Sequence, residues 1–165
     1  MERVGYAPAA WAGFGGALAA VAGALTGLLF VALSVKGAAL SESPPLNARA
    51  AQTLTLFMTS VMIALTLAAP QPATAIGSEL LALAVLAGVL LFVLDRRAGH
   101  ARQPGVARFV ERYSPNTITA LLIGIAGVSL IVQAGGGLFW LIPAVAAALL
   151  GGVANTWIFL VRLPS

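Results

Sequence analysis

Few side chains in this 165-residue sequence are suited to chemistry, and Glu79 is the most conspicuous of them. It is the one carboxylate inside a long apolar segment, close to where that segment begins. A carboxylate at membrane depth is costly and can mark a cation or proton pathway. Near the amino terminus of a helix, however, the helix dipole alone favours a negative charge. We favour this second interpretation, because no arginine or histidine lies at membrane depth to pair with Glu79.

A row of polar residues precedes Glu79 in the chain. Its members share one side of a predicted helix with Met62, at three- and four-residue spacing: Gln52, Thr55, Thr59 and Thr66. Together with Glu79, this row could line a pore or another polar path. Threonine hydroxyls can instead donate to the carbonyl one turn earlier in their own helix, which satisfies them without a partner. We favour this structural interpretation of the row.

The remaining composition excludes most catalytic and metal chemistry. The chain has no cysteine and a single histidine, His100, so thiolate sites and sites with two imidazoles are excluded. The motifs of zinc peptidases, nucleophile elbows and phosphate-binding loops are also missing. We therefore expect no enzyme, no catalytic residue, no metal and no cofactor. The net charge of +4 sits mostly in one short loop without interleaved aromatic residues, so nucleic-acid binding is not expected either.

Apolar segments dominate the sequence and predict its fold. Hydrophobic residues make up 60% of the chain and charged residues 8%, whereas soluble domains have about a quarter charged residues. A helix needs roughly 20 apolar residues to cross a bilayer. Five segments meet this need: residues 11–35, 50–69, 74–94, 116–133 and 138–161. We expect an all-α integral membrane protein, a five-transmembrane-helix bundle forming one domain over residues 1–165.

Turn-forming residues separate these segments, and basic residues orient them. The separators are 41–45 and 70–72, both with proline, the Ser114-Pro115 pair, and the glycines 135–137. With five crossings, Arg3 is alone on one side and the other eight basic residues are on the opposite side. Positive residues stay in the cytoplasm. The amino terminus is therefore expected outside and the carboxyl terminus inside, in the inner (plasma) membrane of a bacterium.

Small residues predict where helices pack closely, because membrane helices associate through backbone approach. The first segment carries Gly15, Ala19, Gly23 and Gly27, and Gly16 and Ala20 lie on the adjoining row. The last segment carries Ala144, Ala148 and Gly152. Both rows are expected to pack within one bundle, with a subunit interface as the alternative. Asn155 in the last segment is expected to find a hydrogen-bond partner on another helix, since its amide cannot be satisfied by its own backbone.

The loop over residues 95–115 is the most basic part of the chain. Five arginines and two acids occur between residues 95 and 113, and apolar residues recur there at helical spacing. This pattern predicts an amphipathic helix on the cytoplasmic face, where each arginine gains about 1 kcal/mol from anionic phospholipid. Whether the loop also docks a partner is left open. The candidate contacts are Arg96, Arg97, Arg102, Arg108, Phe109, Arg112 and Tyr113.

Two segments resemble a family of small, poorly characterised multi-pass membrane proteins of high-GC bacteria. They are residues 25–35, LTGLLFVALSV, and residues 137–143, GLFWLIP. Lys36 stands where that family is expected to have asparagine, so the resemblance implies no polar role there. Such proteins are sometimes labelled modulators of a membrane-anchored protease. The residues themselves support two hypotheses. The small-residue rows, the basic loop and the missing catalytic chemistry favour an accessory, modulatory or structural subunit that is a homo-oligomer or binds a membrane-protein partner. The threonine row and Glu79 favour the alternative, a small homo-oligomeric channel or transport protein with a polar path along the second and third helices.

Overall fold

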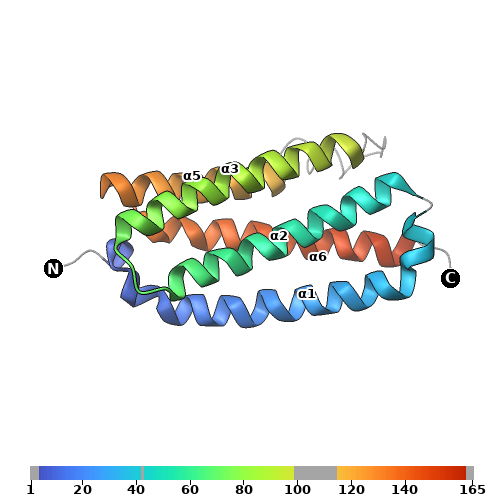
Figure 1. Ribbon diagram of the computed structural model, residues 1–165, viewed down its shortest axis with the longest axis horizontal. Helices are drawn as coiled ribbons and strands as arrows, with labels where there is room; N and C mark the ends of the chain where they lie inside the picture. Colours follow the sequence, from blue (N-terminus) through green and yellow to red (C-terminus); the bar gives the residue numbers. More distant parts are fainter. Residues whose placement is uncertain (1–3, 42, 99–114, 163–165) are drawn as a thin grey trace.

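The computed structural model describes residues 4–41, 43–98 and 115–162. Five α-helices account for most of these residues (Figure 1): α1 (Ala12–Ser41), α2 (Pro44–Ala68), α3 (Ala73–Ala98), α5 (Pro115–Val132) and α6 (Leu141–Arg162). Three short 3-10 helices accompany them, η1 (Val4–Tyr6), η2 (Pro8–Trp11) and η3 (Gly137–Trp140). The described part of the chain has no strand, as an all-α membrane protein requires.

The helices run alternately in opposite directions and form three layers (Figure 1). The first layer is α1, the second is α2 with α6, and the third is α3 with α5. α2 is central because it packs against α1, α3 and α6, whereas α1 packs mainly against α2. Four stretches are long and apolar enough to span a membrane: Pro8–Val35, Pro44–Ala68, Ala73–Arg97 and Gly137–Trp157. The apolar helix Asn116–Val132 is shorter.

The predicted segments occur as helices, and the first three extend further than expected. α3 continues to Ala98 rather than ending at residue 94, so Asp95, Arg96 and Arg97 lie in this helix and not in the loop. α1 continues to Ser41 rather than ending near residue 35. α2 begins at Pro44 rather than at residue 50. The two prolines of that region occupy the first turn of α2, where a missing N–H costs no hydrogen bond and the ring favours the helical φ. The link between α1 and α2 is therefore much shorter than the gap between residues 35 and 50 that the sequence predicted.

The core lies around α2, in the middle layer. Leu56, Phe57 and Ile63 of α2 are almost completely buried. Leu56 packs with Leu91 of α3 and Ala148 of α6, and Ile63 belongs to a buried cluster with apolar residues of α3, α5 and α6. In lipid, burial excludes lipid tails rather than water, so dense packing and paired polar atoms are the main sources of stability.

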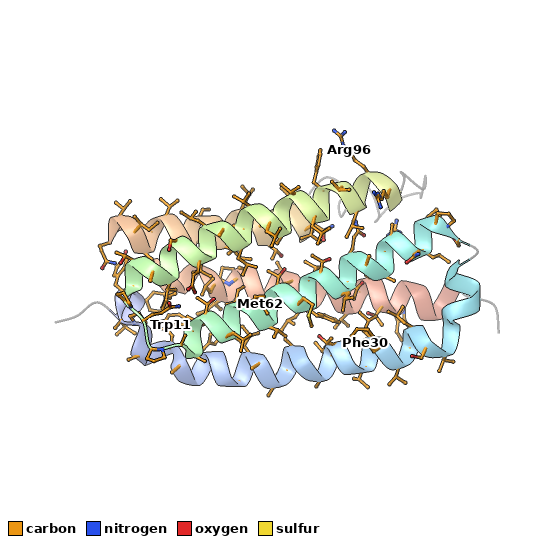
Figure 2. All side chains as sticks on the ribbon, in the orientation of Figure 1. Trp11, Phe30, Met62 and Arg96 are labelled. Atoms are coloured by element: carbon orange, nitrogen blue, oxygen red, sulfur yellow. The ribbon has the colours of Figure 1, made fainter. Side chains whose placement is uncertain are left out.

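The amino-terminal segment closes one end of the bundle by packing on the α5–α6 turn. The Tyr6 hydroxyl accepts a hydrogen bond from the Gly136 N–H at 2.8 Å. Trp11 is buried there (Figure 2), and its ring meets that of Phe139 edge-on with centroids 5.2 Å apart. The turn itself requires glycine, because φ is +88°, +111° and +60° at residues 135–137. The glycine run therefore separates two helices as predicted, and Trp11 packs against the η3 helix that follows it.

Candidate functional site

The predicted polar path is divided between the two ends of the α2–α3 pair. Gln71, in the α2–α3 turn, donates from Nε2 to Glu79 Oε2 at 2.8 Å, and Glu79 is exposed. Gln52 donates from Nε2 to Asp95 Oδ1 at 3.2 Å near the other end of α3. The sixteen positions from Glu79 to Asp95 correspond to roughly 24 Å along a helix. The structure therefore does not bring Glu79 and Gln52 together.

The threonines between these ends bond within α2. Thr55 Oγ1 donates to the Ala51 carbonyl and Thr59 Oγ1 to the Thr55 carbonyl, each at 2.8 Å. The Thr66 carbonyl accepts from Gln71 Nε2 at 3.4 Å. Hydroxyls satisfied by their own helix do not need water or an ion beside them. Thr55 and Thr59 therefore make the hydrogen bonds that the structural interpretation of the row predicts.

Two of the predicted small residues lie directly against α2. A Cβ added to Gly15 would be 3.0 Å from Leu67 Cβ and 3.2 Å from the Ala64 carbonyl oxygen. A Cβ added to Gly152 would overlap the ring of Phe57, which is 2% exposed. Ala144 and Ala148 of α6 are completely buried, and Ala19 is half-buried against the core. These residues bring α1 and α6 close to the central helix.

Gly23 and Gly27 lie elsewhere, on the exposed side of α1. Both are exposed, and nothing lies within 4 Å of an added Cβ at either position. The packing predicted for them inside the bundle is therefore not made, because the row to which they belong turns away from α2. Asn155 is half-buried. Among the described residues, none hydrogen-bonds to its amide, so the predicted cross-helix partner is not found there.

The basic loop is described only at its beginning. Arg96 and Arg97 are exposed at the end of α3, and the Arg96 guanidinium lies over the Phe92 ring, 4.4 Å from its centroid. Figure 2 shows Arg96 projecting from α3 away from the other helices. Five predicted contact residues lie outside the described ranges: Arg102, Arg108, Phe109, Arg112 and Tyr113.

The α3–α5 contact is a feature that the sequence analysis missed. A Cβ added to Gly127 would be 2.8 Å from the Gly77 carbonyl oxygen, and one added to Gly77 would be 2.9 Å from the Gly127 carbonyl oxygen. The backbones of α3 and α5 therefore touch. The sequence does carry a signal for this contact, because small residues recur at helical spacing in both segments. They are Gly77, Ala84 and Gly88 in the third segment and Ala120, Gly124 and Gly127 in the fourth.

Beside this contact, α3 and α5 form a groove of about 990 Å³. Its walls are apolar along most of their length, and Asp95, Asn116 and Thr117 lie at one end. No protein-family model, curated protein or solved structure matches the chain. Within residues 4–41, 43–98 and 115–162, no three histidine, aspartate or glutamate side chains come close enough to hold a metal ion.

Proposed function

We propose that this chain is a non-enzymatic, five-span protein of the bacterial inner membrane that serves as an accessory, modulatory or structural subunit of a membrane complex. The observation that carries the proposal is the outward face of α1. A row of small residues at three- and four-residue spacing is exposed along this face: Gly13, Gly16, Ala20, Gly23 and Gly27. Nothing lies within 4 Å of an added Cβ at any of the four glycines.

Such a row supports contact with another transmembrane helix. Small residues let two helix backbones approach, which strengthens the van der Waals contacts that hold membrane helices together. Alternating three- and four-residue spacing suits a left-handed crossing of about 20°. The α1 row is free for this contact because α1 packs mainly against α2, from its opposite side. The small-residue positions that face α2, such as Gly15, are already occupied.

The five-span topology rests on the lengths and directions of the helices. α5 has 18 residues, or roughly 27 Å, against about 30 Å of hydrocarbon. A shortfall of a few ångströms is tolerated by local thinning of the bilayer. The alternating directions place the α1–α2 link and the end of α3 at the same end of the bundle (Figure 1). Arg49, Arg96 and Arg97 belong to that end, which is the cytoplasmic side by the positive-inside rule.

Single cysteines test this topology, because the natural chain has none. Gln71→Cys and Ala134→Cys, at the two turns opposite the basic end, are expected to react with an impermeant maleimide on intact cells. Asn47→Cys, at the exposed start of α2, is expected to react only after lysis. The reverse pattern would show that the orientation is wrong, and labelling of Gln71→Cys and Ala134→Cys from opposite sides would contradict five spans.

The proposed role is tested by native mass spectrometry after gentle extraction of the protein from its own membrane. We expect a second transmembrane protein, or further copies of this chain, to remain bound. Gly23→Leu is expected to release this partner, whereas Ala17→Leu, exposed on α1 outside the glycine row, is expected to retain it. A wild-type protein that is always a lone monomer would contradict the proposal. Arg108→Gln with Arg112→Gln tests whether the basic loop contributes to the same association.

The resemblance to small multi-pass proteins of high-GC bacteria is consistent with this proposal and adds no residue roles. A channel is the weaker candidate, because Thr55 and Thr59 bond within α2 and Glu79 is held by Gln71 at the bundle end. Reconstituted liposomes distinguish the two functions. We expect no ion flux above that of protein-free vesicles, and a flux abolished by Glu79→Gln would favour the channel.

A further inference from the structure

The groove between α3 and α5 has a floor of small residues and walls of large ones. A Cβ added to Gly88 would be 3.4 Å from Ala120 Cβ, and one added to Gly124 would be 3.7 Å from Ala84 Cβ. Exposed apolar side chains border this floor, such as Val89 on α3 and Leu121 on α5. The groove therefore faces away from the core and opens toward lipid along the proposed spans.

The length of the groove suits an acyl chain. From Leu81 to Asp95 it follows fourteen positions of α3, or roughly 21 Å. One leaflet is about 15 Å of hydrocarbon, half of the roughly 30 Å core. A chain from one leaflet therefore fits within the groove.

One end of the groove is polar and carries both signs of charge. The Asp95 carboxylate is exposed there and is positioned by Gln52, whose side chain is 4% exposed. The Arg96 guanidinium lies over Phe92, which also lines the groove. A carboxylate and a guanidinium are therefore carried by consecutive residues of α3, next to this end of the groove.

The first turn of α5 contributes uncharged polar groups to the same end. Asn116 is 8% exposed and lines the groove. Thr117 is exposed beside it. The first N–H groups of an α-helix have no carbonyl partner within the helix and attract phosphate.

We propose that this groove binds a phospholipid with a primary-amine headgroup, such as phosphatidylethanolamine. Its ammonium group donates to the Asp95 carboxylate, and its phosphate binds the Arg96 guanidinium at the next position of α3. One acyl chain lies along the floor at Gly88 and Gly124. A purely anionic headgroup would satisfy Arg96 but would place no cation at Asp95, and a choline headgroup has no N–H to donate. The proposal needs α3 and α5 to span the membrane but does not depend on the accessory role.

The test measures lipid retained by the full-length protein. The protein is purified in detergent, equilibrated with equimolar phosphatidylethanolamine, phosphatidylglycerol and phosphatidylcholine, and examined by native mass spectrometry. We expect about tenfold enrichment of the ethanolamine lipid, the factor that corresponds to about 1.4 kcal/mol. Asp95→Asn is expected to remove this preference. Glu79→Gln, a carboxylate change at the opposite end of α3, serves as the matched control and is expected to preserve it.

Two further variants fill the groove rather than alter its charge. Gly88→Leu and Leu121→Trp are expected to reduce retention of all three lipids while gel-filtration elution and helical circular dichroism stay unchanged. Equal retention of the glycerol and ethanolamine lipids by wild type and Asp95→Asn would overturn the proposal, because general attraction to arginine would then explain the binding. A protein subunit displaced by both groove-filling variants would also overturn it, since a partner helix would then be the occupant.

Discussion

Replacing Gly127 with alanine tests how closely α3 and α5 approach each other. The new Cβ would be 2.8 Å from the Gly77 carbonyl oxygen, 2.9 Å from Leu81 Cγ and 3.0 Å from the Leu81 nitrogen. Two of these three atoms are backbone, so the neighbour cannot yield by changing a rotamer. Overpacking of this kind costs about 1–3 kcal/mol. We expect the helices to separate and the free energy of unfolding to fall accordingly.

Gly23→Ala is the matched control, because nothing lies within 4 Å of its added Cβ. Alanine is a better helix former than glycine by about 1 kcal/mol, and both variants gain this contribution. The difference between their free energies of unfolding therefore isolates the overpacking cost of about 1–3 kcal/mol. Reversible unfolding with increasing dodecyl sulfate in mixed micelles, followed by tryptophan fluorescence, measures this difference.

A reciprocal substitution strengthens the test. Gly77→Ala would place its Cβ 2.9 Å from the Gly127 carbonyl oxygen. Once one alanine has separated the helices, the second has less to displace. The double variant should therefore lose less stability than the sum of the two single losses, as expected for residues in contact. Equal stabilities of Gly127→Ala and Gly23→Ala would refute the close α3–α5 contact and, with it, the floor of the groove.

Four other substitutions have expected outcomes in the same unfolding assay. Thr119→Val should raise the free energy of unfolding by about 1 kcal/mol, because Thr119 Oγ1 is buried without a hydrogen-bond partner in the described structure. Thr59→Val should lower it by about 1 kcal/mol, because it removes the hydrogen bond to the Thr55 carbonyl. Gly137→Ala should lower the free energy of unfolding by about 2 kcal/mol or more, since φ is +60° and the new Cβ would overlap the Gly5 carbonyl. A variant as stable as wild type would contradict the observed turn. Glu79→Gln should change stability by less than about 0.5 kcal/mol, because its hydrogen bond to Gln71 is exposed, and a larger loss would show that Glu79 is structurally important.

The positions of the helices could be predicted from the sequence because a membrane limits what an apolar segment can do. Prolines at 70 and 72 and the glycines at 135–137 separate helices as expected, whereas those at 44 and 45 begin α2. The extra turns at the end of α1 and the start of α2 could not be predicted, because no apolar pattern marks them. Proline there indicated a break, yet it equally suits the first turn of a helix.

The side of each small residue was harder to predict than its helix. Gly15 and Gly23 belong to the same predicted row, but Gly15 lies against Leu67 and Gly23 is exposed. In a soluble helix a polar face would mark the outside, whereas in α1 both sides are apolar. The Gln52–Asp95 hydrogen bond could not be predicted either, since it joins residues 43 positions apart on two helices.

The amino-terminal closure has a consequence for the order of events during synthesis. Tyr6 leaves the ribosome early, but its hydrogen-bond partner at Gly136 lies 130 residues later. This contact cannot form until the final hairpin has been made and inserted, and contacts between distant residues are slow to form. Tyr6 therefore lacks this partner, and Trp11 lacks its contact with Phe139, while the rest of the chain emerges. Their docking would be a late step of assembly, joining parts of the chain that are synthesised 130 residues apart.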